Sequence, residues 1–148
     1  MEFNDAKYKE VSDLVRNIKL DDLSFNLFDI YYFLRMCPHY NTETNQVNGH
    51  AAEYITPCDG NGFGIYIWND LEEKIQRVLL LHEIIEVFHR NQGMEATPAH
   101  DATIPWERRF RGEYLTASET KKYLKFKKDN GGLATLLKRR EGKYENQG

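Results

Sequence analysis

The sequence has no long hydrophobic run, and this absence argues against a membrane-spanning helix. A helix needs about 18 or more consecutive apolar residues to cross a bilayer, and no such stretch occurs. The first residues, MEFNDAKYKEV, are polar and lack the apolar segment of a secretory signal. We therefore expect no contact with a membrane and no export.

Cysteine is also scarce. Cys37 and Cys58 stand 21 positions apart, without the CxxC spacing of a redox or zinc motif. Two such cysteines fit a reducing compartment better than a disulfide framework, so a cytoplasmic location is expected. The glycines of DGNGFG precede neither a Lys-Ser nor a Lys-Thr pair, and spaced acidic residues are missing, which excludes a phosphate-binding loop and a calcium loop.

The chain does have the length of about one domain and an uneven charge. Its net charge is -3, although residues 121–148 alone carry nine Lys or Arg against three Asp or Glu. We expect one domain over residues 1–120 and a basic helical extension or tail over residues 121–148. This extension can contact nucleic acid or an acidic partner, or it can be a solvated terminal helix.

Apolar spacing predicts two helices in the first third of the chain. Apolar residues recur at helical intervals over residues 4–18. The strongly apolar segment 23–36 predicts a second helix, with Asp21 or Asp22 as its N-cap. Residues 38–50 are rich in Asn and Thr and are expected to form a loop.

The pattern then changes to β-prone residues. Residues 51–58 and 63–69 flank the sequence DGNG, whose Asp-Gly and Asn-Gly pairs suit a tight turn, so a hairpin is predicted. A long helix follows over about residues 70–92, with the polar pair Asn69-Asp70 as its start and Gly93 as its C-cap.

Further helices are expected downstream. Pro98 can open a short helix, which Pro105 can interrupt. Residues 112–130 predict another helix, with Thr116 or Ser118 as its cap. Together these elements define an α+β fold with N-terminal helices, a small antiparallel sheet, a long helix and additional helices.

One stripe of the long helix is polar. A rotation of about 100° per residue puts His82, Glu86 and His89 on one narrow face, whereas the remaining positions are mostly apolar. Side chains spaced in this way can converge on one metal ion. Each residue also has an ordinary interpretation, as polar residues at the edge of a buried face or, for His89, as a partner of the helix dipole.

The same helix carries a resemblance to a known family. The segment His82-Glu83-Ile84-Ile85-Glu86 resembles the HExxH helix of zincin metallopeptidases, with the second His replaced by Glu. The sequence GIYIWND followed by LEEKIQRVLLLHE resembles the edge strand and active-site helix of the small ImmA/IrrE-like zincins. The similarity covers residues 63–90 and, more loosely, residues 50–110.

This resemblance implies a zinc site and names its residues. His82 and Glu86 would bind Zn²⁺, and Glu83 would be the general base that activates a bound water. The third ligand in zincins comes from a downstream helix. His100 is the first candidate here, and the alternatives are His89, Asp101 and Glu107.

Two functions follow as expectations. The first is a zinc-dependent hydrolase, most simply a peptidase acting on a protein or peptide substrate that pairs with an edge strand near residues 63–69. The second is a non-catalytic regulatory or interaction module on a zincin-like scaffold, contacting an acidic partner through its basic tail. Nucleic-acid binding through residues 121–148 is a third possibility.

Overall fold

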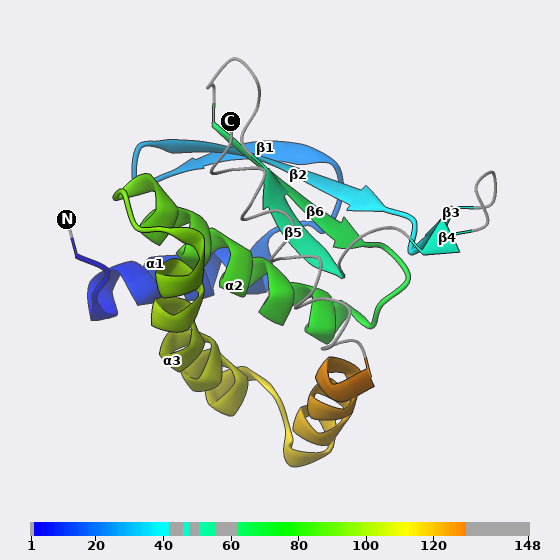
Figure 1. Cartoon of the computed structure of the whole chain (residues 1–148). Coiled ribbons are helices and arrows are strands. Elements are labelled where there is room, and N and C mark those ends of the chain that lie inside the picture. Colours follow the sequence, from blue (N-terminus) through cyan, green and yellow to red (C-terminus); the bar gives the residue numbers. More distant parts are fainter. Residues whose placement is uncertain (1, 42–45, 48–50, 56–61, 130–148) are drawn as a thin grey trace.

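The computed structural model describes residues 2–41, 46–47, 51–55 and 62–129 (Figure 1). It has the expected α+β class. A further helix, residues 117–129, follows the last labelled helix. The labelled elements are α1 (Asp5–Asn17), β1 (Leu23–Leu27), β2 (Ile30–Cys37), β3 (Tyr40–Asn41), β4 (Gln46–Val47), β5 (Ala52–Ile55), β6 (Phe63–Trp68), α2 (Glu73–Asn91) and α3 (Ala96–Tyr114).

The main sheet is mixed rather than antiparallel, so this part of the prediction is wrong, and its four strands have the order β1-β2-β6-β5. β1 pairs with β2 and β5 pairs with β6 in antiparallel fashion, whereas β2 and β6 are parallel. The predicted hairpin is confirmed in β5 and β6, and residues 56–58 of its first strand lie outside the described residues. The expected edge strand near residues 63–69 is wrong, because β6 has a partner on each side. The edges of this sheet are β1 and β5.

The helix predicted over residues 23–36 is also wrong, because this segment forms the hairpin β1–β2. Its turn residues, Phe28 and Asp29, both have positive φ angles, of 55° and 62°, as a tight two-residue hairpin turn requires. Asp22 does not cap a helix; its Oδ1 accepts a hydrogen bond from Met36 N at 3.0 Å. Side chains of β2 alternate between buried and more exposed positions, which is the period of a half-buried strand.

Within the predicted loop over residues 38–50, β3 and β4 pair as a separate two-stranded sheet. The predicted first helix is confirmed as α1, which starts with the side chain of Asn4 accepting a hydrogen bond from Lys7 N. Figure 1 shows α1 and α2 on the same face of the main sheet, with α3 next to α2.

The long helix α2 is the centre of the fold. All of its residues from 75 to 89 are buried, because the sheet, α1 and α3 pack around it. Gly93 has a φ angle of 94° and ends the helix as predicted. The predicted start is wrong: the N-cap is Glu72, and no side chain caps the helix there.

Two shorter predictions need correction at their boundaries. α3 runs without a break through Pro105 as far as Tyr114, so the expected interruption does not occur. Residues 112–114 therefore belong to α3, and the next helix covers residues 117–129 of the described chain. Thr116 caps it as predicted, since Thr116 Oγ1 accepts from Glu119 N and Glu119 Oε1 accepts from Thr116 N.

The basic extension is described only in its first part. Residues 121–129 are helical, and residues 130–148 lie outside the described residues. Ion pairs from Lys122 to Glu72 and from Glu119 to Lys74 connect this helix to the N-terminal end of α2. None of the helices within the described residues is long and apolar enough to cross a membrane.

Candidate metal centre

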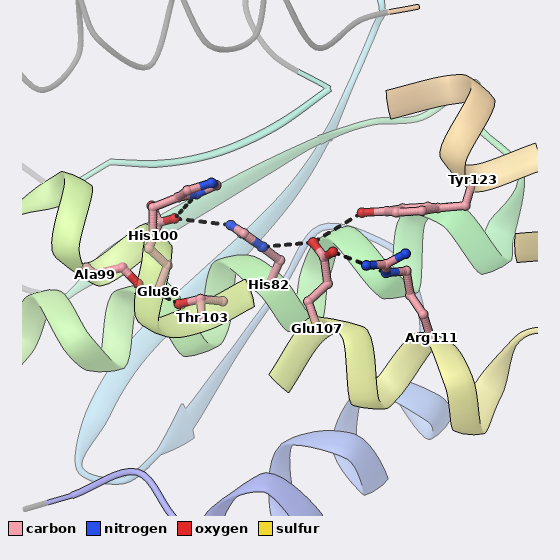
Figure 2. A network of polar contacts seen from close by, with 8 residues as sticks. All are labelled: His82, Glu86, Ala99, His100, Thr103, Glu107, Arg111 and Tyr123. Carbon is pink, nitrogen blue, oxygen red and sulfur yellow. Dashed lines mark hydrogen bonds and ion pairs between the residues drawn. The ribbon is translucent and has the colours of Figure 1, made fainter. Parts of the chain in front are cut away.

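α2 and α3 bring together the three residues that were predicted to bind a metal. His82 and Glu86 are one helical turn apart on α2, and His100 lies near the start of α3 (Figure 2). One potential ligand atom from each residue lies within 4.8 Å of the other two. The turn at Gly93 reverses the chain between the helices, so that the first part of α3 returns to the middle of α2.

Glu86 is the centre of the group. Its Oε1 lies 3.1 Å from Nε2 of His82 and 3.0 Å from Nδ1 of His100. His82 and Glu86 are buried, whereas 36% of the His100 side chain is exposed. The group therefore has a dry side within the protein and an opening toward solvent at His100.

The other ring nitrogen of His82 contacts a second carboxylate. His82 Nδ1 lies 2.9 Å from Glu107 Oε1, which also accepts a hydrogen bond from the Tyr123 hydroxyl at 3.1 Å. Arg111 Nε lies 3.2 Å from Glu107 Oε2. Burial raises the pKa of the Glu107 carboxyl, but His82, Lys127 and Arg111 together outweigh this effect and hold the pKa at about 2. Glu107 is therefore an ionised acceptor.

The proton count around His82 is informative. An ionised Glu107 accepts the Nδ1–H of His82, so in a neutral imidazole Nε2 carries only a lone pair. That lone pair lies 3.1 Å from an oxygen of Glu86. An additional proton or a metal ion between these two atoms turns this repulsive contact into an attractive one.

The geometry fits a divalent metal such as zinc. Bonds of about 2.0–2.2 Å at tetrahedral angles place neighbouring ligand atoms about 3.3 Å apart. Glu86 Oε1 is 3.1 and 3.0 Å from the two ring nitrogens, and all three atoms lie within 4.8 Å. Two imidazoles and one carboxylate form a donor set that zinc accepts in catalytic sites.

The remaining candidates lie elsewhere. Asp101 is exposed and is not part of the group. His89 is not part of it either: its ring contacts those of Phe3 and Phe88, with centroids at 6.0 and 5.7 Å. Glu107 contacts the opposite nitrogen of His82 from the one that faces Glu86.

Glu83, the predicted general base, is buried on α2, with 2% of its surface exposed. It is not one of the three grouped residues. Burial and Glu107 raise the pKa of Tyr123, and the charge of Glu83 adds a smaller effect, so Glu83 lies near Tyr123.

Two partners of Glu107, Arg111 and Tyr123, are not predicted from the sequence. Arg111 stands four residues after Glu107 on α3, and this spacing of opposite charges is a signal that the sequence contains. Tyr123 has no comparable signal, because its contact depends on how the helix of residues 117–129 returns to α3.

Comparison with family models, with curated proteins and with solved structures finds no match for this chain. The argument for a function therefore depends on the chemistry of the His82, Glu86 and His100 group.

Proposed function

We propose that this protein is a zinc-dependent hydrolase of the zincin type, most simply a peptidase. The observation that carries the proposal is the convergence of His82, Glu86 and His100, which come from two helices, around one carboxylate oxygen. Buried polar side chains usually satisfy one another or backbone groups with matched donors and acceptors. Here ring nitrogens of two histidines converge on one oxygen of a buried carboxylate, which is an arrangement that a cation stabilises.

The roles of the three grouped residues follow from their positions, and the role of Glu83 follows from the resemblance to zincins. His82 and Glu86 provide the buried side of the centre, and His100 closes it at the solvent-facing side. When bound, zinc lowers the pKa of a coordinated water and polarises a substrate carbonyl. Glu83, adjacent to His82 on α2 and buried, is the residue that would accept the proton of that water and pass it to the leaving amine.

A peptide substrate would pair with β5 rather than with β6. β6 uses both of its edges, for β2 and β5, whereas β5 pairs only on its β6 side among the strands that the structure describes. An extended peptide beside β5 would receive backbone hydrogen bonds without displacing any of these strands. β5 also packs against α2, the helix that carries His82 and Glu86.

The first test is the metal content of protein purified without chelator and without a His-tag. Near-stoichiometric zinc is expected in the wild type and is expected to fall in His82→Ala, Glu86→Ala and His100→Ala. His39→Ala is the matched control, because 36% of the His39 side chain is exposed, as for His100, and its Nδ1 also contacts a carboxylate, that of Asp70 at 3.1 Å. Folded wild-type protein that holds no metal after addition of zinc would overturn the proposal.

The second test separates a hydrolase from an interaction module. Glu83→Gln is expected to keep the zinc and to lose cleavage of an unfolded protein substrate, because it removes the proton acceptor and no ligand. A wild-type protein that binds zinc, cleaves no peptide and still captures an acidic partner would instead support the non-catalytic alternative.

A further inference from the structure

The two nitrogens of the His82 ring have different partners. Nε2 faces Glu86, and Nδ1 faces Glu107 from α3 (Figure 2). A histidine that binds a metal through one nitrogen needs the proton on the other one, and a ring without a fixed partner exchanges this proton between both positions. The partner of Nδ1 therefore decides how often Nε2 is ready to bind a metal.

Glu107 is itself held in place from two sides. Tyr123 donates to Oε1, and Arg111 lies beside Oε2. Glu107 and Tyr123 are 3% and 1% exposed, and the Arg111 guanidinium lies 5.2 Å from the centre of the Tyr123 ring. Water cannot compete for the carboxylate in such a site, so its orientation toward His82 is kept by α3 and by the helix of residues 117–129.

We propose that Glu107 is a positioning residue, whose carboxylate accepts the Nδ1–H of His82 and thereby directs the Nε2 lone pair toward Glu86 and His100. Tyr123 and Arg111 keep the carboxylate in the orientation that this requires. The inference depends on the proposed function for the identity of the ion, but the hydrogen bond and the ring tautomer exist without it. A purely structural Glu107 would affect the stability of the fold and neither the tautomer nor the affinity for zinc.

The first experiment measures zinc affinity by competition with a chromophoric chelator. Partners of ligating histidines contribute about 10- to 100-fold in metal affinity, so we expect a loss of about tenfold in Glu107→Gln and about hundredfold in Glu107→Leu. Glu113→Gln makes the same chemical change on the same helix, where Glu113 accepts a hydrogen bond from Tyr8, and should leave the affinity unchanged. Tyr123→Phe keeps the buried ring, removes the donor to Glu107 and should give a smaller loss than Glu107→Gln.

The second experiment reads the proton directly, by NMR of the ring nitrogens in ¹⁵N-histidine-labelled, metal-free protein. Nδ1 of His82 is expected to carry a proton in the wild type, and in Glu107→Leu the proton is expected to shift to Nε2. If the Leu variant does not fold, the position of the ring proton is measured in Glu107→Gln instead, because this smaller change keeps the shape of the side chain.

The outcomes separate this inference from the proposed function. Unchanged zinc affinity in both Glu107 variants would overturn the positioning role while the zinc site stands. A wild type that binds no zinc would overturn the proposed function, and the NMR spectrum would still decide whether Glu107 holds the Nδ1 proton. A wild-type ring with its proton on Nε2 alone would overturn the inference in either case.

Discussion

Two buried polar clusters lie on α2, and they are satisfied in different ways. Near the start of the helix, Arg77 Nη1 donates to the carbonyls of Val15 at 2.6 Å and Ile18 at 2.8 Å, and Nη2 donates to Glu73 Oε1 at 2.7 Å. These carbonyls belong to the C-terminal end of α1, where a helix leaves acceptors unpaired and favours a positive charge. The cluster around Arg77 therefore matches donors with acceptors and needs nothing more.

The second cluster, His82 with Glu86, His100 and Glu107, has a different balance. Two carboxylates surround one imidazole, and a neutral His82 has a single proton to donate. The first cluster is explained by folding, since it joins α1 to α2. The second gains from one more positive charge, either a proton or a metal ion, whereas the cluster around Arg77 already holds its own.

The largest expected effect is the loss of stability when the first cluster is broken. Arg77→Met leaves the carbonyls at the end of α1 without their buried donor, so the free energy of unfolding should fall by about 3 kcal/mol. Urea denaturation with and without zinc measures it, and the loss should be the same in both conditions. Arg90→Met is the control on the same helix, because Arg90 also donates to a backbone carbonyl, that of Met94, but at the opposite end of α2. If the loss depended on zinc, the cluster around Arg77 would not be independent of the metal site, which would contradict the comparison of the two clusters.

The next effect concerns the second cluster alone. Zinc at about 100 times its dissociation constant should raise the free energy of unfolding of the wild type by about 2.7 kcal/mol. The same increment is expected in Arg77→Met, whose cluster is remote from the ligands, and should vanish in Glu86→Gln. Thermal melting with added zinc provides the measurement. An equal shift in Glu86→Gln would mean that zinc binds elsewhere.

Part of this site could be predicted from the sequence, because helix geometry relates residues that are close in the chain. The positions of His82 and Glu86 on one face follow from their spacing of four residues. The hairpin β5–β6 follows from Asp-Gly and Asn-Gly, and the end of α2 from Gly93. His100 is one of several candidates for the third ligand in the sequence. Only the packing of α3 on α2 distinguishes it from Asp101.

The errors come from features that local patterns do not contain. The hairpin β1–β2 has Phe28 and Asp29 in its turn, without the glycine or asparagine that usually marks such turns. Phe28 is kept there by tertiary packing, with its ring 5.6 Å from that of Phe88 on α2. In the same way, the contact of Tyr123 with Glu107 depends on how the helix of residues 117–129 packs against α3, and no spacing in the sequence predicts this packing.

A smaller effect sharpens the comparison in the absence of metal. In Glu86→Gln the amide can donate a hydrogen bond to Nε2 of a neutral His82, which has only a lone pair to offer the wild-type carboxylate when its proton is on Nδ1. The metal-free variant should therefore be more stable than the metal-free wild type by about 1 kcal/mol. Urea denaturation in chelator is the measurement, with Glu113→Gln as the control. A less stable variant would show that the contact is already satisfied without metal.

The smallest effect concerns His89, another buried polar residue of α2, which belongs to neither cluster. Its Nε2 is buried and has no hydrogen-bond partner among the described residues, and its ring contacts Phe3 and Phe88. Replacing it in His89→Phe removes the buried polar atom and should stabilise the protein by about 0.5 kcal/mol at neutral pH, since crowding by the larger ring offsets part of the gain.

The stabilisation by His89→Phe should increase as the pH falls. Burial lowers the pKa of His89 below its ordinary value of 6.5, against a smaller opposing effect of Glu86. Below pH 6.5 the unfolded chain therefore binds a proton that the folded protein does not, and the wild type loses stability that it has in full above this pH. The Phe variant lacks this loss. Urea denaturation across this pH range measures the difference, and a difference that shrinks on acidification would place a proton acceptor beside His89 and group it with His82.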